Sequence, residues 1–186
     1  MASAFAHAFV AVSSGSAFGF KSCPWRLWFC GIFCAVIPDI DILAFEFGIP
    51  YESFWGHRGF THSLVFASLL AALLTLLFFR REQVRGWIFL YLFFCGASHG
   101  LLDAMTNGGL GVAFFSPFDN ARHFLPWRPI RVSPVVASRF FTLRGLGILQ
   151  NEAIWIGLPC LGALMVGMMR RRRSIERRSG LESQKS

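Results

Sequence analysis

The sequence predicts an all-α protein, a polytopic membrane helical bundle with four or five transmembrane helices. A long Pro- and aromatic-rich loop is expected to cap a site at one membrane face. Hydrophobic residues make up 54% of the 186 residues and charged residues only 15%, whereas a soluble domain carries about 25% charged residues. Apolar runs of about 20 residues recur, which is the length a helix needs to cross a bilayer. This pattern excludes intrinsic disorder, a coiled coil and a free cytosolic enzyme.

Four segments are long and apolar enough to be predicted as firm spans, namely residues 25–45, 64–79, 86–105 and 148–169. A fifth segment, residues 2–20, is weaker because it is rich in small residues and contains a Ser-Ser-Gly-Ser run. It either spans the membrane or lies against the other helices. The Gly, Ala and Ser residues in these runs allow helices to approach one another closely.

The segment 106–147 is the one long stretch that tolerates polar residues. Its prolines and glycines forbid a regular helix through the middle, and its Phe and Trp residues predict an ordered cap. Residues 1–169 are therefore expected to form one membrane-embedded domain. Residues 170–186 are expected to form a basic, disordered cytoplasmic tail.

The formal charge of +8 predicts the orientation of the chain. Basic residues cluster near residues 21–26 and 80–85 and in the tail at 170–178. If every firm span crosses the bilayer, these clusters share one side, which the positive-inside rule assigns to the cytoplasm. The segment 106–147 then lies outside, although it also carries arginines. Membrane lipids are the expected partners, and no nucleic-acid partner is expected.

The acids and histidines within or beside the spans are few and informative. A charged group in hydrocarbon costs about 2.5–3.5 kcal/mol on insertion scales, so it usually needs a partner, a metal or a watery cavity. Alternating spans place all of these groups at one membrane face, whichever way the protein is oriented. They are His7, Asp39, Asp41, His57, His62, His99, Asp103 and Glu152.

The spacing and chemistry of these residues favour a metal site. His99 and Asp103 are four residues apart, so a helix places them on one face. Imidazole together with carboxylate suits Zn, Mn, Fe or Ni. The set exceeds one tetrahedral site, which indicates two metals, or one metal with residues that orient its ligands. The candidate ligands are His7, Asp39, Asp41, His57, His62, His99 and Asp103, with Asp41 as a further ligand or an orienting residue.

Plainer interpretations stay open beside the metal site. A lone His on an apolar face is more often packed and hydrogen-bonded than a ligand, and an Asp at a helix rim is often a cap. Buried His and Asp also line proton-relay and ion-transport pathways. The position of the groups weighs against transport, because they gather at one rim rather than being strung through the bilayer.

Three motifs, together with His7 and the stretch 106–118, resemble a known family. They are Pro-Asp-Ile-Asp at 38–41, His-Arg-Gly-Phe-Thr-His-Ser at 57–63 and His-Gly-Leu-Leu-Asp at 99–103. The ordered set, over about residues 1–160, is similar to the bacterial inner-membrane metal-dependent hydrolases (the YdjM/YbcI-like, LexA-regulated membrane proteins). The resemblance implies an inner-membrane location, metal dependence and hydrolase activity on an undefined substrate.

We therefore expect a membrane-bound metal-dependent hydrolase with one or two divalent ions, Zn or Mn, per chain and its site at the outer face. Metal-activated water would attack a lipid-like or amphipathic substrate, with a lipid phosphoester as the favoured version. Arg58 is assigned to an oxyanion, and Glu152, or a carboxylate that is not bound to the metal, is assigned to taking the proton. The alternative is a non-enzymatic metal-binding scaffold or a metal or proton transporter.

Three arginines of the segment 106–147 are assigned to substrate binding at the mouth of the site. They are Arg122, Arg128 and Arg131, and they lie among aromatic residues. A guanidinium donates two parallel hydrogen bonds to phosphate, which is the reason for the assignment. Contact with lipid headgroups or anchoring of the loop is an equally weighted interpretation.

Overall fold

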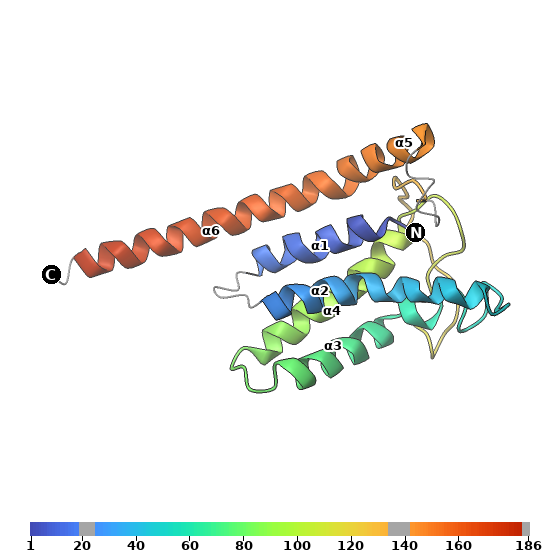
Figure 1. Cartoon of the computed structure of the whole chain (residues 1–186), viewed down its shortest axis with the longest axis horizontal. Helices are drawn as coiled ribbons and strands as arrows, with labels where there is room; N and C mark the ends of the chain where they lie inside the picture. The colour runs from blue at the N-terminus through green and yellow to red at the C-terminus, as the bar shows by residue number, and fades with distance from the viewer. Residues whose placement is uncertain (19–24, 134–141, 184–186) are drawn as a thin grey trace.

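The computed structural model describes residues 1–18, 25–133 and 142–183. Within these ranges the chain is helical, and β-structure is limited to two isolated bridges, Thr106–Ile130 and Val112–His123. The all-helical class is thus confirmed. The helices are α1 (Ala4–Ala17), α2 (Trp25–Val36), α3 (Leu64–Phe78), α4 (Arg85–Ala104), α5 (Leu143–Glu152) and α6 (Leu158–Ser183), and α6 runs along one edge of the bundle (Figure 1).

Three stretches of the described chain are long and apolar enough to cross a membrane. They are Trp25–Phe45, Arg85–Ala104 and Leu143–Arg170. The helices α1 and α3 are apolar but shorter, at 14 and 15 residues. At 1.5 Å per residue, α3 is roughly 22 Å long, less than a hydrocarbon core of about 30 Å. The helix is short because Ser63 caps its start and accepts a hydrogen bond from the Phe66 amide.

The first long span changes its helical form part-way. The α-helix α2 ends at Val36 and continues as the 3₁₀ helix η1 (Ile37–Phe45). Pro38 lies at the junction, where it has no amide hydrogen to continue the α-helical hydrogen bonding. A 3₁₀ segment of 9 residues is unusual, since such runs rarely exceed 3–4 residues and often mark functional positions. Asp39 and Asp41 both lie in η1.

Two expectations from the sequence need correction here. The end of the predicted loop is helical, because the Thr142 hydroxyl accepts from the Gly145 amide and starts α5 at Leu143. The tail is also helical as far as Ser183 rather than disordered. An existing helix extends without a new nucleation step, and its Arg and Glu residues are good helix formers. The predicted connection at 19–24, including Lys21, and the loop residues 134–141, including Arg139, lie outside the described residues.

Small residues allow the bundle core to pack closely. The largest buried cluster joins α1, α2, α3 and α4 and includes Leu27, Cys34, Leu74 and Leu92. Tyr91 of α4 fits against Gly31, where an added Cβ would lie 2.2 Å from the phenol oxygen. Its hydroxyl donates to the Ala11 carbonyl over 3.0 Å, so α1, α2 and α4 meet at one point.

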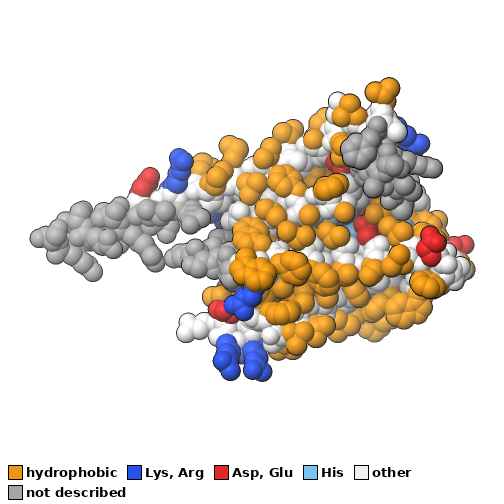
Figure 2. Space-filling model, viewed as in Figure 1, with side chains coloured by type: hydrophobic (Ala, Val, Ile, Leu, Met, Phe, Trp, Pro, Cys, Tyr) orange, Lys and Arg blue, Asp and Glu red, His pale blue; other side chains and the backbone are white. Residues whose placement is uncertain are grey.

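Large apolar side chains also cover the outside of the bundle. Figure 2 shows hydrophobic side chains over most of the visible face. On α3, for example, Leu69 is 60% exposed and Leu76 is 65% exposed. Soluble monomers rarely expose such a continuous apolar surface, so this surface fits contact with lipid.

Candidate metal centre

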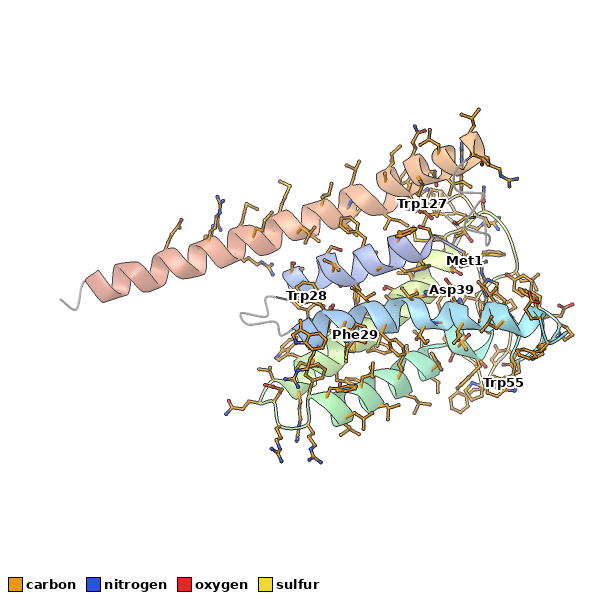
Figure 3. All side chains as sticks on the ribbon, viewed as in Figure 1. Met1, Trp28, Phe29, Asp39, Trp55 and Trp127 are labelled. Atoms are coloured by element: carbon orange, nitrogen blue, oxygen red, sulfur yellow. The ribbon has the colours of Figure 1, made fainter. Side chains whose placement is uncertain are left out.

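Polar groups gather at one end of the bundle, where four separate elements meet. The elements are the start of α1, the 3₁₀ helix η1, the short η2 (Phe60–His62) and the C-terminal turn of α4 (Figures 1 and 3). Segments far apart in sequence therefore contribute side chains to a single site. The structure places all of the predicted ligand residues at this end.

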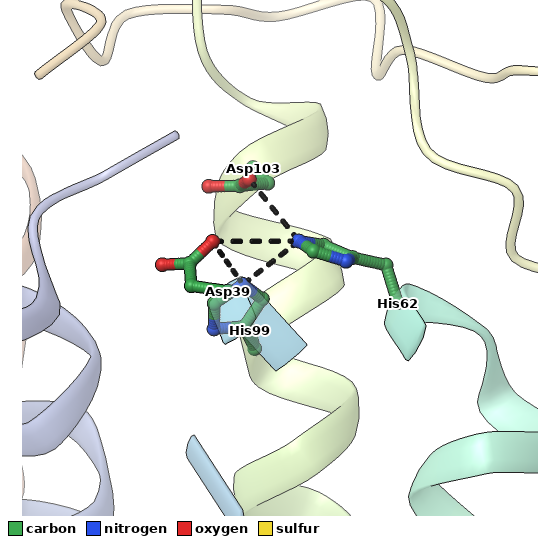
Figure 4. A group of neighbouring side chains, drawn as sticks. All are labelled: Asp39, His62, His99 and Asp103. Atoms are coloured by element: carbon green, nitrogen blue, oxygen red, sulfur yellow. Dashed lines mark hydrogen bonds and ion pairs between the residues drawn. The ribbon is translucent and has the colours of Figure 1, made fainter. Parts of the chain in front are cut away.

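Four of these side chains form a compact set of possible metal ligands (Figure 4). Asp39, His62, His99 and Asp103 each offer one ligand atom, and the four atoms lie within 4.8 Å of one another. His99 Nε2 is 3.3 Å from Asp39 Oδ1, and His62 Nε2 is 3.6 Å from Asp103 Oδ2. The His and Asp103 side chains are fully buried, and that of Asp39 is 8% exposed. This donor set suits Zn²⁺ or a similar divalent ion.

The hydrogen bonds of the two histidines determine which ring nitrogens are free to bind a metal. His99 Nδ1 is 2.7 Å from the Ala35 carbonyl oxygen, which can only accept, so Nδ1 carries the hydrogen. His62 Nδ1 lies 3.1 Å from the Thr61 hydroxyl oxygen and 3.1 Å from Asp41 Oδ2; because the Thr61 hydroxyl itself donates to Asp41, this Nδ1 likewise carries a hydrogen and donates. Both Nε2 atoms are therefore left with lone pairs in the neutral rings, and they face each other at 3.0 Å. A proton or a metal ion between them relieves the repulsion.

Asp41 belongs to a second cluster that supports the first. One carboxylate oxygen lies 2.7 Å from His57 Nδ1. The other accepts from the Thr61 hydroxyl at 2.6 Å and from the Arg58 amide at 3.1 Å. Asp41, His57 and His62 also bring three ligand atoms within 4.8 Å of one another. Because His62 presents Nδ1 to this cluster and Nε2 to the other, Asp41 orients a ring that can bind metal.

The protonation of His62 depends on the three carboxylates around it. Burial alone would lower the pKa of this imidazole, but hydrogen bonds with Asp103, Asp39 and Asp41 raise the pKa well above its usual value. Three negative charges around one ring favour a positive charge at this position, either a proton or a metal ion.

Asp103 has partners besides the histidines. Its Oδ2 lies 3.1 Å from Arg58 Nε, and its Oδ1 accepts from the Ala2 amide at 2.8 Å. His7 Nε2 is 3.6 Å from Asp103 Oδ1, and the His7 ring stacks on that of His99 with centroids 3.8 Å apart. Neither ring nitrogen of His7 has a hydrogen-bond partner among the described residues. His7 thus lies beside the four-residue set with its nitrogens uncommitted.

Comparison with known proteins supports the membrane assignment made from composition. The chain matches the YdjM inner membrane protein family over residues 1–174. The chain belongs to this family. A curated relative, the inner membrane protein YbcI of Escherichia coli (strain K12), is 42% identical over 166 residues, covering 88% of this chain and 94% of the relative. No solved structure matches. The resemblance seen in the three motifs is confirmed, and the YdjM-family chain is an inner membrane protein.

Arg58 of the YdjM-family chain has a different environment from the one its assignment implies. The side chain is 1% exposed, and Nη1 donates to the carbonyls of Gly108 and Leu110 at 3.1 and 2.7 Å. Nη2 donates to the Thr106 hydroxyl at 3.0 Å, while Nε faces Asp103. With its donors directed at these protein groups, Arg58 holds the loop over the metal centre. Contact with a substrate oxyanion stays an untested prediction.

Glu152 contacts the N-terminal segment of the chain and does not lie among the possible metal ligands. Its two oxygens accept from the Ser3 amide and the Ser3 hydroxyl, each at 2.6 Å. It ends α5, and the next residues form the π-helical turn η4 (Ala153–Gly157). These contacts indicate an anchor for the N-terminal segment that carries His7. Its predicted role as a proton acceptor has no supporting contact.

The three arginines assigned to the mouth of the site lie in three different environments. Arg122 donates to the carbonyls of Tyr51, Ser53 and His57, so it anchors the loop before η2. Arg128 is exposed and stacks over Phe124 at 4.7 Å. Arg131 lines a separate cavity of about 250 Å³ together with Arg144. None of these contacts is to the four-residue set.

Sequence reasoning missed three groups that position the centre. Thr61 binds Asp41, the Ala35 carbonyl orients His99, and Ser3 holds Glu152. A hydroxyl directly before His62 is a weak signal that was available in the sequence. The other two groups show no sequence signal, because a backbone carbonyl is present at every position and Ser3 also serves as a helix cap.

Proposed function

We propose that this YdjM-family protein is a membrane-embedded, metal-dependent hydrolase with one divalent ion at Asp39, His62 and His99. The observation that carries the proposal is the 3.0 Å approach of two imidazole Nε2 atoms whose Nδ1 atoms are both committed as donors. At this distance the two Nε2 atoms need a cation between them, and a divalent ion bound there would replace the proton that the metal-free pair holds.

The residues present fit a divalent ion. Neither oxygen of Asp39 has a hydrogen-bond partner among the described residues, although both are buried, and Asp103 Oδ2 is also without one. Buried carboxylate oxygens without hydrogen bonds are costly unless a cation satisfies them. Two neutral imidazoles and one or two carboxylates form an accepted ligand set for Zn²⁺.

Whether Asp103 binds the metal determines whether the coordination shell keeps a position free for water or substrate. Asp103 already faces Arg58 and the Ala2 amide, so its charge is compensated without a metal. If it stays with these partners, three protein ligands leave a fourth position open, as catalytic zinc sites require.

A bound divalent ion supplies hydrolytic chemistry by lowering the pKa of its water to about 7. The chain's own residues then handle the proton. Asp103 Oδ1 and His7 Nε2 are 3.6 Å apart, and both ring nitrogens of His7 are uncommitted. This pair can accept a proton at the centre and pass it on, which assigns to His7 and Asp103 the role first given to Glu152.

The candidate site lies at one end of an apolar helical bundle, which supports a lipid-like or amphipathic substrate. A lipid phosphoester stays the favoured version. The basic residues at the opposite end of the bundle support a cytoplasmic location for that end and an outer-face location for the site.

A structural metal site is the second candidate. It is favoured by the presence of four protein donors within 4.8 Å, because four protein ligands close a tetrahedral shell. In that case the metal would tie η1, η2 and α4 together without catalysis.

The test combines metal analysis with activity. Purified wild type should contain a stoichiometric divalent ion and hydrolyse a member of a panel of phospholipids and phosphoesters. The variant His62→Ala should lose both properties, whereas His123→Ala, in the exposed loop, should keep both. Bound metal with no turnover on any substrate would favour the structural site, and a metal-free wild type would refute both candidates.

A further inference from the structure

A groove on the outside of the first span leads to the proposed metal centre. It is a cavity of about 440 Å³ formed along α2 and η1. Its walls are Phe29, Ile32, Phe33, Val36, Ile37 and Ile40, and Asp39 also lines it. Figure 3 shows Phe29 and Asp39 well separated along this one helical segment, with Asp39 toward the end that holds the site. The groove therefore connects a lipid-facing surface with a ligand of the centre.

The groove is apolar along almost its whole length, and Asp39 is the one polar residue among the described residues that line it. The side chain of Asp39 is 8% exposed, and neither of its oxygens has a hydrogen-bond partner among the described residues. Because both Asp39 oxygens are buried, a molecule that matches the groove is apolar along it, and only a polar group beyond its Asp39 end lies toward the four-residue set.

The length of the groove matches one leaflet of a membrane. From Phe29 to Val36 the α-helix rises roughly 10 Å, and the 3₁₀ segment to Ile40 adds roughly 8 Å. A leaflet accounts for half of a hydrocarbon core of about 30 Å, or roughly 15 Å. The groove can therefore hold a stretch of a single acyl chain about one leaflet in length.

The surroundings determine which apolar molecule is available. The groove lies on the stretch Trp25–Phe45, which is long and apolar enough to span the membrane, and Phe29 at its far end is 64% exposed. A membrane lipid is the molecule that surrounds such a surface at high concentration. Asp39 lies in the 3₁₀ helix η1 and lines the groove together with apolar residues of α2 and η1.

We propose that this groove holds one acyl chain of a bilayer lipid and presents the polar head of that lipid to the metal centre. The assignment of the head end rests on the proposed function, whereas the acyl-chain site rests on the groove itself. The substrate thus enters sideways from the membrane, along α2, without first leaving the bilayer.

The test uses the full chain in nanodiscs of phosphatidylethanolamine and phosphatidylglycerol. A fraction of the phosphatidylethanolamine carries a photoreactive diazirine at the end of one acyl chain or at its middle. After illumination, mass spectrometry locates the lipid adducts. The terminal probe should label the Phe29 end of the groove and the mid-chain probe the region of Val36. Labelling of the groove should exceed that of the equally lipid-facing α3 residues Leu69 and Leu73 several-fold.

Two groove variants and one matched control complete the test. Val36→Trp fills the groove and Phe33→Ala removes a wall, so either should reduce groove labelling several-fold, while Leu73→Trp on α3 should not. The second groove variant keeps the test decisive if the first does not fold. Equal labelling of α2 and α3, or no change in a folded groove variant, overturns the proposal.

Metal analysis of the same samples separates this proposal from the proposed function. The groove variants should keep the metal content of the wild type, because neither residue is a ligand. Groove labelling in a protein that binds no metal would refute the hydrolase and support the acyl-chain site. Stoichiometric metal with equal labelling of both helices would refute the acyl-chain site and leave the metal centre standing.

Discussion

His62 Nε2 and His99 Nε2 lie 3.0 Å apart at the buried end of the bundle, and each ring donates from its other nitrogen to a fixed oxygen. This relationship supports the proposal that both rings bind a metal ion. The Asp41 carboxylate and the Ala35 carbonyl fix the orientation of the two rings through Nδ1. They are therefore as important for the arrangement as the Asp39 and Asp103 carboxylates near the Nε2 atoms.

Removal of either ring should abolish metal binding. His62→Ala and His99→Ala each remove one of the two nitrogen donors of the four-residue set, so metal content measured by mass spectrometry should fall to background. His123 is the matched control, since its ring contacts Phe115 in the loop and is absent from both ligand groups. Full metal content in both ring variants would exclude this centre.

Asp41→Asn should weaken metal binding without abolishing it. The amide keeps the shape of the side chain but removes the charge that orients His62 through Nδ1. Loss of such an orienting carboxylate typically costs about 10–100-fold in metal affinity. Chelator competition measures this change, and Asp119→Asn, an exposed loop substitution, is the control. Complete loss of metal would instead make Asp41 a direct ligand.

Metal affinity should fall as the pH is lowered. The carboxylates around His62 raise its pKa well above the usual value, so the metal-free ring holds a proton at neutral pH. Metal binding must displace that proton, and affinity should therefore increase with pH by about tenfold per unit while one proton is released. Calorimetry in two buffers of different ionisation enthalpy measures the release. A pH-independent affinity would contradict the displacement.

Arg58→Met should destabilise the protein more than it changes substrate affinity. The substitution leaves Asp103 without its cation and two loop carbonyls without donors. Breaking a buried ion pair in this way costs about 3–5 kcal/mol. Unfolding in detergent measures the loss, and exposed Arg128→Met should change stability little. A normally stable variant with a raised KM would show that Arg58 contacts the substrate instead.

Glu152 and Ser3 should act as one unit. Glu152→Ala leaves two buried donors of Ser3 without an acceptor, which costs about 1–3 kcal/mol for each unsatisfied group. The double variant with Ser3→Ala should lose less than the sum of the single losses, as expected for residues in contact. Full stability in Glu152→Ala with complete loss of hydrolysis would restore its role as proton acceptor.

The convergence of polar groups was predictable because the chain has so few of them. Each acid or histidine near a span had to share a face with the others, and the motif spacing alone placed His99 and Asp103 on one helical face. The roles of Arg58 and Glu152 were not predictable in this way. Their partners depend on contacts between residues far apart in sequence, such as Ser3 and Glu152, which are separated by 149 positions. The side-chain type shows that a residue is charged, but the tertiary structure determines which partner neutralises that charge.

The 3₁₀ helix η1, which begins around Pro38, limits which substitutions the candidate site can tolerate. It places Asp39 and Asp41 on either side of one imidazole, so His62 faces Asp39 through Nε2 and Asp41 through Nδ1. The two acids therefore cannot vary independently, although they belong to different clusters. A substitution at one alters the ring on which the other depends. Pro38, which belongs to neither group of possible ligands, thereby limits which sequences can keep this arrangement.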